Sequence, residues 1–253
     1  LIYFTKKYYR LTFNFKLRFK RKVKLFFKKL LPSILSSGVT QINILVGTII
    51  ASFEASAVSY LYYADRIYQI NLALAGIAVG TVSLPVLSKA FKQKNIKKIS
   101  NIQNRSLELS LLLYIPASLG LIIASKEIVS ALFGYGSFTI ENVEMTSAAL
   151  KFFGYGVPAF ALIKILSNFF FARNNTKTPF YISTFIVLLN IIISVSFFGR
   201  FGFVIIPIAT SISTWVGVII YLYILNSKNY LLLKNYLFKN ILKIILSTIL
   251  MSF

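Results

Sequence analysis

Apolar runs of about 20 residues recur along this 253-residue chain, and they constrain its fold more than any other feature. A helix needs about 20 residues to cross a hydrocarbon core about 30 Å thick. Backbone groups in lipid must be bonded within the protein, and the alternation of a barrel strand is absent, so each run should be a helix. A composition of 57% hydrophobic and 13% charged residues agrees. The sequence therefore predicts an all-α integral membrane protein.

The apolar runs divide the chain into six complete spans and the beginning of a seventh. The spans cover approximately residues 33–53, 61–88, 106–125, 147–172, 181–198 and 204–225, with the seventh starting near residue 238. We therefore expect a six-helix lobe over 31–226, preceded by a basic linker over 1–30. Residues 227–253 would form a second linker and the start of an additional helix. Because the chain begins at Leu1 and stops inside an apolar run, we expect a fragment with both ends cut.

The 28 Lys and Arg residues far outnumber the 6 Asp and Glu residues, and their placement predicts an orientation. Eleven fall within residues 5–30 and six between Lys89 and Arg105, and basic connections alternate with acidic or nearly neutral ones. Cytoplasmic loops are enriched in Lys and Arg, so the basic connections should be cytoplasmic and the first span should run outward. A net charge of +22 would suggest nucleic acid in a soluble protein, but membrane topology explains these positions better.

Glycine and proline mark the second span, in the run LALAGIAVGTVSLP. Gly76 and Gly80 form a small-xxx-small pair that allows close packing of helices, or that provides a hinge for rocking. Pro85 would kink the same span, as in many channels and transporters, although ordinary packing also accounts for it. Packing and gating therefore both remain open for these three residues.

Ionisable residues within predicted spans are costly in lipid and usually face a cavity. Asp65 and Arg66 point about 100° apart on a helix, so each needs another partner: water, a second helix or a ligand. The guanidinium of Arg66 suits a phosphate, or it lies near the outer interface and reaches water. Lys151 and Lys164, in the fourth span, would line a cationic cavity or pair with a neighbouring helix. Because cations outnumber acids in the spans, an anionic substrate such as a phosphorylated headgroup is favoured.

The chain contains no Cys and no His. Disulfides, thiol chemistry, imidazole bases and the usual zinc sites are therefore excluded. Paired carboxylates at catalytic spacing are also absent from the sequence, so we expect no enzyme activity, no metal and no cofactor.

Four stretches between residues 33 and 225 carry a family resemblance. They are QINILVGTIIASF followed by VSYLYYADRIYQ, then GIAVGTVSLPVLSKAF, LFGYGSFT and FFARNNTKTP. Together and in this order they resemble the second half of the MurJ (MviN) family of lipid II flippases. This family is part of the larger group of multidrug, oligosaccharidyl-lipid and polysaccharide exporters.

The resemblance implies one of two six-helix transporter lobes around a central cavity, in the bacterial inner membrane. The substrate would be lipid II, the undecaprenyl-pyrophosphate-linked cell-wall precursor, and the partners would be membrane lipids and the N-terminal lobe of the same protein. Residues 1–30 would join the lobes, and the run from Phe238 would begin the first of two extra helices. By motif match Arg66 would engage the pyrophosphate beside Asp65, and Lys164 also matches in its span.

The same resemblance places Arg173, Lys177 and Pro179 in a cytoplasmic turn with a structural role. Two positions depart from the family pattern. Some relatives carry Asn or Asp around the position of Gly47, and some carry a carboxylate at the position of Ser194. These departures argue against a sodium site, and no coupling ion is assigned.

Two other classes of function remain open. One is an exporter of drugs, cations or polysaccharide-linked lipids with the same fold, which acidic residues in the absent first lobe would favour. The other is a non-transporting membrane scaffold, which a lobe gene without its mate would favour.

Overall fold

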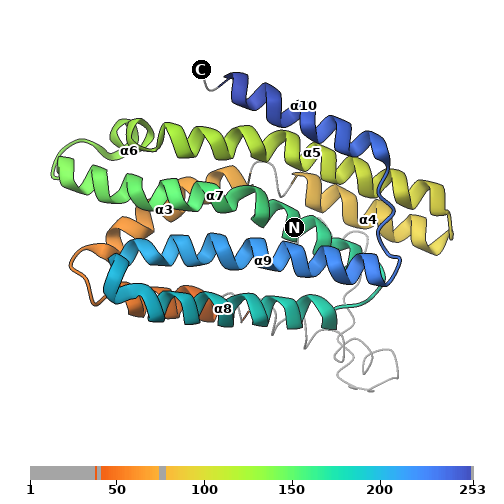
Figure 1. The fold of residues 1–253 in the computed structure, drawn as a ribbon, viewed down its shortest axis with the longest axis horizontal. Helices are drawn as coiled ribbons and strands as arrows, with labels where there is room; N and C mark the ends of the chain where they lie inside the picture. Colours follow the sequence, from red (N-terminus) through yellow and green to blue (C-terminus); the bar gives the residue numbers. More distant parts are fainter. Residues whose placement is uncertain (1–37, 39–40, 74–77, 252–253) are drawn as a thin grey trace, which may run out of the picture.

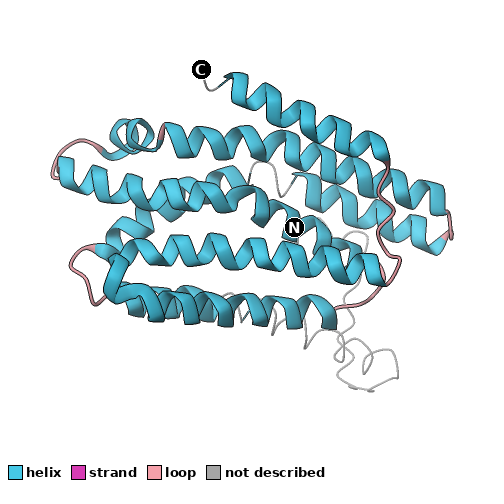
Figure 2. Ribbon diagram, viewed as in Figure 1, coloured by secondary structure: helices cyan, strands magenta, loops and turns pink. Residues whose placement is uncertain are grey.

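The computed structural model describes residue 38, residues 41–73 and residues 78–251. Every regular element in these residues is a helix, which confirms the predicted all-α class (Figure 2). The predicted basic linker over 1–30 and the hinge candidate Gly76 lie outside the described residues.

The helices follow one another with short connections (Figure 1). They are an unlabelled helix Gln41–Ala51, α3 Ala57–Leu72, α4 Ala78–Lys92, α5 Ile96–Ile123, α6 Ser125–Phe133, α7 Ile140–Phe171, α8 Lys177–Phe201, the 3-10 turn η2 Gly202–Val204, α9 Ile205–Ser227 and α10 Asn235–Met251. In the described part of the chain, three helical stretches are long and apolar enough to cross a membrane: α5, α7, and the stretch that contains α8 and α9. The fifth and sixth predicted spans thus correspond to α8 and α9.

Several helices extend beyond the predicted spans because polar residues cap them. α5 begins ten residues before its predicted start, where the Lys98 N–H donates to the Asn95 side chain at 2.9 Å. α7 begins at Ile140 rather than near 147, and the Asn142 N–H donates to the Thr139 hydroxyl at 3.3 Å. Residues 125–146, which the predicted spans leave as a connection, therefore contain α6 and the first turns of α7.

The predicted second span is described as two helices, α3 and α4, which pack along α7 in succession. Tyr60 of α3 donates to the Asn142 side chain near the start of α7, at 3.1 Å. Asn168 near the other end of α7 donates to the Gly80 carbonyl of α4, at 3.0 Å. The two helices together thus follow most of the length of α7 and run parallel to it.

α7 is the central helix of the bundle, with α5 along one side and α9 along the other (Figure 1). Small residues allow these close approaches. The Gly154 carbonyl accepts from Ser118 of α5 at 2.7 Å, and Gly156 lies directly against Ser211 of α9. Ser211 in turn donates to the Phe152 carbonyl at 2.7 Å. A larger residue at either glycine would separate α7 from a neighbour.

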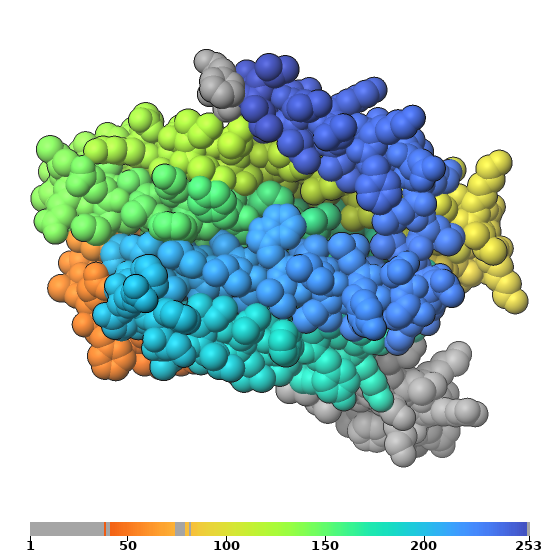
Figure 3. Space-filling view, viewed as in Figure 1, coloured from red at the N-terminus to blue at the C-terminus, as the bar shows by residue number. Residues whose placement is uncertain are grey.

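α10 lies over α5 (Figure 3), and an extended segment over residues 230–234 leads into it. Buried amide side chains of α5 bond this segment's backbone. Gln103 donates to the Tyr230 carbonyl at 2.8 Å and accepts from the Leu232 N–H at 3.3 Å. Asn104 donates to the Leu232 carbonyl at 2.6 Å and accepts from the Lys234 N–H at 2.9 Å. The two amides therefore provide hydrogen-bond partners for backbone groups of residues 230–234, which are not part of a helix.

At the opposite end of the bundle, Glu54 closes the turn between α8 and α9. The Phe203 N–H donates to Glu54 Oε2 at 2.7 Å. Gly202 has a φ of 60°, and a Cβ at this position would lie 2.8 Å from the same oxygen. Glycine is therefore required here both by its backbone conformation and by the close carboxylate.

We predict that Asn104→Leu destabilises the complete protein by about 2–3 kcal/mol, because it leaves the Lys234 N–H and the Leu232 carbonyl with fewer partners in a buried position. Thermal unfolding in detergent measures this change. Asn226→Ala, at an exposed position at the end of α9, is the control and should have little effect. Equal effects of the two substitutions would contradict a role for the buried amide.

We also predict that Gly202→Ala lowers stability by about 1–3 kcal/mol, since its φ of 60° and ψ of −154° lie in a region that essentially only glycine adopts. Gly199→Ala provides a matched control three residues away, because nothing lies within 4 Å of a Cβ added there. It should be neutral or slightly stabilising in the helix. Parallel melting curves of the two variants test the comparison, which fails if Gly199→Ala is the more damaging.

Candidate substrate-binding face

α3 presents one polar face and one buried face. Ala57, Ala64, Ile67 and Tyr68 are buried on the side that packs against the bundle. On the other side, a sector of about 100° carries the polar and charged residues of the YYADRIYQ stretch. These residues are Tyr62, Asp65, Arg66 and Gln69. The predicted pair of Asp65 and Arg66 therefore lies on the exposed side of the helix.

Each member of the pair is bonded to a residue one turn away on α3 rather than to its neighbour. Arg66 is exposed, and its Nη2 donates to the Tyr62 hydroxyl at 3.1 Å, with the guanidinium 4.7 Å from the centre of the Tyr62 ring. Asp65 is half-buried and accepts a hydrogen bond from Gln69. Arg66 has five N–H donors, and the described residues engage one of them. The guanidinium is thus positioned but retains donors for an anion.

Lys164 lies on the flank of α7 that faces the second span. It is one turn after Phe160, which contacts Tyr68 of α3, and one turn before Asn168, which bonds Gly80 of α4. A Cβ added to Gly80 would lie 3.6 Å from Lys164 Cγ, an ordinary van der Waals contact, so the lysine chain lies close to this turn of α4. Lys164 is exposed, and the described residues contain no ion pair for it.

Lys151 lies elsewhere on α7. It is thirteen residues before Lys164 and hence about 140° away around the helix. It is exposed on the same side as Glu144 and Tyr155. The structure therefore brings Asp65 and Arg66 together, places Lys164 on the α7 flank that carries their helix, and separates Lys151 from Lys164.

The predicted cytoplasmic turn is organised around Arg173. Its Nη1 donates to the Phe169 carbonyl at 2.8 Å and its Nη2 to the Tyr230 carbonyl at 2.6 Å. The guanidinium also lies 4.2 Å from the ring centres of both Phe91 and Tyr230. Burial lowers the pKa of Arg173 to about 10, so it remains a cation at neutral pH. Arg173 thus joins α4, α7 and the segment before α10.

The remaining predicted residues have different surroundings. Lys177 is exposed at the first residue of α8, and Pro179 is buried two residues later. The Thr178 N–H donates to the Asn175 side chain at 3.1 Å, which caps this helix. Pro85 is exposed within α4.

Sequence reasoning did not identify Gln103, Asn104 or Asn168 as important residues. All three are buried amides that bond the backbone of another segment. For Asn168 the available signal was an amide in an apolar stretch of its helix, which must have a partner when it is buried. Gln103 and Asn104 lie in the polar first half of α5, where the sequence gives no such signal. The identity of the partner could not be obtained from the sequence.

A family model described as lipid II flippase MurJ matches residues 1–253. The chain belongs to the MurJ family. A probable lipid II flippase MurJ of Rhizobium tropici is 39% identical over 202 residues, covering 80% of this chain and 38% of that relative. The corresponding protein of Rickettsia prowazekii is 38% identical over 192 residues, or 74% of this chain and 38% of the relative. The predicted family is thereby confirmed.

Solved structures agree with this assignment. A lipid II flippase MurJ in an inward closed conformation matches with a TM-score of 0.76 and 33% identity, over 94% of this chain and 49% of that one. An outward-facing multidrug resistance MATE family transporter matches with a TM-score of 0.70 and 20% identity, over 88% of this chain and 51% of the transporter chain. This match shows a shared fold. The chain thus spans between 38% and 51% of these proteins, and it is a multi-pass protein of the bacterial inner membrane.

We predict that Arg173→Lys destabilises the complete protein by about 1–2 kcal/mol, because lysine cannot bond both carbonyls and stack between both rings. Thermal unfolding in detergent measures the loss. The reciprocal substitution Lys177→Arg, at an exposed position of the same turn, should leave the melting temperature unchanged. Similar melting temperatures for Arg173→Lys and the parent would contradict the bridging role.

Proposed function

We propose that this chain forms one lobe of a lipid II flippase, which moves the undecaprenyl-pyrophosphate-linked peptidoglycan precursor from the inner to the outer leaflet. The observation that carries the proposal is the match of the MurJ family model over residues 1–253. Since the chain covers 49% of the matched flippase structure, the other lobe would come from the rest of the same protein. The lobes would open alternately to the two sides of the membrane.

Within this lobe, Arg66 is the residue that we assign to the pyrophosphate. Its guanidinium is exposed, is held by Tyr62 and retains several donors, which suits the oxygens of a phosphate. Asp65, bonded to Gln69, would limit the local positive charge so that the substrate can be released. Lys164 would add a cation from α7 on the side of the second span, and Lys151 would act on a separate face.

The remaining segments would support this transport cycle. Residues 1–30 would link the two lobes in the cytoplasm, residues 31–226 would form the transporter lobe, and residues 227–253 would lead into an extra helix. Gly80 and Pro85 would permit movement of the second span. The chemistry is movement of a lipid without a covalent step, so the protein would not be an enzyme.

A drug or cation exporter is the second candidate, supported by the likeness of fold to a MATE family transporter. At 20% identity this likeness does not extend to substrate. The exposed arginine on α3 favours an anionic substrate over a cationic one. A scaffold that binds a cell-wall partner without transport is a third candidate.

We predict that Arg66→Ala lowers lipid II transport by the complete protein about tenfold to a hundredfold, as expected for loss of a charged hydrogen bond. The measurement is growth, together with precursor appearance in the outer leaflet, in cells depleted of their own lipid II flippase. Arg66→Lys should retain part of the activity because it keeps the charge. Arg200→Ala removes another exposed arginine, near the end of α8, and is the control.

Expression of each variant is compared in isolated membranes. Normal transport by Arg66→Ala at equal expression would refute the phosphate role of Arg66. If the parent protein reaches the membrane but the precursor remains inside, the substrate assignment itself fails, and an exporter or a scaffold becomes the better explanation.

A further inference from the structure

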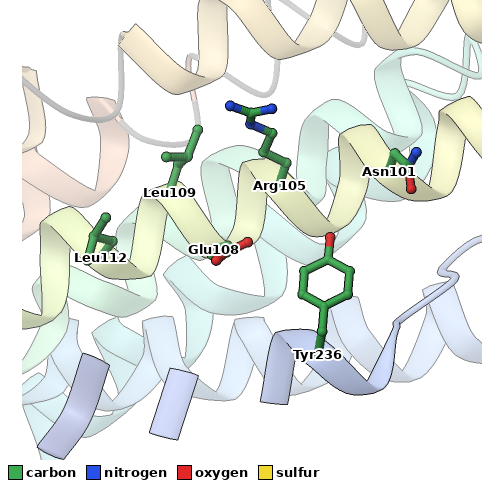
Figure 4. Close-up of a pocket in the computed structure, with 6 residues that line it drawn as sticks. All are labelled: Asn101, Arg105, Glu108, Leu109, Leu112 and Tyr236. Atoms are coloured by element: carbon green, nitrogen blue, oxygen red, sulfur yellow. The ribbon is translucent and has the colours of Figure 1, made fainter. Parts of the chain in front are cut away.

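A groove of about 450 Å³ lies along α5 beside the start of α10 (Figure 4). Six residues line it: Asn101, Arg105, Glu108, Leu109, Leu112 and Tyr236. The volume is within the range of small-molecule sites, about 300–1,000 Å³. The flippase activity proposed above assigns no role to this groove.

The side chains of the groove change from polar to apolar along α5. Arg105 and Leu109 are one turn apart and point to the same side of the helix, while Tyr236 reaches toward α5 from α10 (Figure 4). Leu112 is another turn further along. Arg105 lies at the boundary between the basic start of α5 and its apolar part, which is the expected depth of lipid headgroups. A ligand with a polar head and an apolar tail would match this order.

The groove offers mainly hydrogen-bond donors. Two acceptors of the groove already receive a hydrogen bond, because Asn240 donates to Glu108 Oε1 at 2.7 Å and Lys234 donates to the Asn101 side-chain carbonyl. Arg105 is exposed and has no hydrogen bond or ion pair among the described residues. The free groups are the Arg105 guanidinium, the Asn101 amide N–H groups and the Tyr236 hydroxyl, which together suit a phosphate.

The surrounding charge also favours an anion. The turn between α4 and α5 and the first turn of α5 are rich in exposed lysines. Lys234 lies at the edge of the groove, 5.9 Å from the centre of the Tyr236 ring. Basic residues at a membrane surface attract anionic lipids. Among the described residues that line the groove, Glu108 is the one acid, and the nearby cations outnumber it.

We propose that this groove binds an anionic phospholipid of the cytoplasmic leaflet. Its phosphate is held by Arg105, Asn101 and Tyr236, and one acyl chain lies along Leu109 and Leu112. The bound lipid contacts both α5 and α10 and therefore stabilises the docking of α10 on the lobe. This site is separate from the α3 face proposed for lipid II.

The test uses the complete protein in detergent, titrated with phosphatidylglycerol or with phosphatidylcholine of the same acyl chains, and native mass spectrometry counts the retained lipid. The parent should retain phosphatidylglycerol in preference to phosphatidylcholine. Arg105→Gln should weaken phosphatidylglycerol retention roughly tenfold, as expected for a lost charged hydrogen bond. Lys97→Gln removes an exposed cation of the same helix that does not line the groove, and should change retention less than about twofold.

A second variant, Leu112→Trp, fills the apolar part of the groove and leaves its charges in place. It should reduce retention as well, and it keeps the test informative if Arg105→Gln does not fold. Equal losses in Arg105→Gln and Lys97→Gln would overturn the site in favour of general surface charge. The site would also be overturned if the parent showed no preference for phosphatidylglycerol. That is the result expected if another segment of the complete protein fills the groove. Lipid retention is measured without transport, so failure of the flippase proposal would leave this result unaffected.

Discussion

A backbone N–H or C=O in the hydrocarbon layer has no water to bond, and this constraint governs the rest of the structure. Helices satisfy it along their length but not at their ends or in connections. In this chain, side chains form hydrogen bonds with the backbone groups at the ends of the bundle. Gln103 and Asn104 bond the segment before α10, Glu54 bonds the turn between α8 and α9, and Arg173 bonds two carbonyls near the end of α7. These polar residues therefore hold the connections in place.

The same constraint explains why α7 is central. Between helices in lipid there is little hydrophobic driving force, so close packing and interhelical hydrogen bonds replace it. α7 provides both, through Gly154 and Gly156 and through backbone carbonyls that accept from Ser118 and Ser211. Its neighbours α5, α9, α3 and α4 are thereby fixed relative to one another. The faces that these helices leave exposed follow from their packing on α7.

Much of the fold could be predicted from hydropathy and charge, because both act locally along the chain. Hydropathy detected the apolar part of each helix but not the polar turns that Asn95 and Thr139 cap, so α5 and α7 extended further than predicted. α6 was missed because it is short and lies among charged residues. The contact of Gln103 with Tyr230 joins residues 127 apart in sequence, and no local pattern indicates such a pair. Helical spacing predicted that Asp65 and Arg66 point about 100° apart and need separate partners, whereas the identity of these partners, Gln69 and Tyr62, required the structure.

Three arginines show why charge in the sequence alone does not identify a binding residue. Arg173 donates to two carbonyls and lies between two aromatic rings, so an incoming anion would have to replace interactions that already stabilise the cation. Arg66 makes one hydrogen bond within its own helix and keeps its other donors exposed. Arg105 has no such bond among the described residues and borders an apolar groove. A phosphate gains most where donors are positioned but not yet bonded, because it then displaces water rather than protein. By this criterion we propose Arg66 and Arg105 as ligand sites with different partners, whereas the contacts of Arg173 favour a structural role despite its place in a family motif.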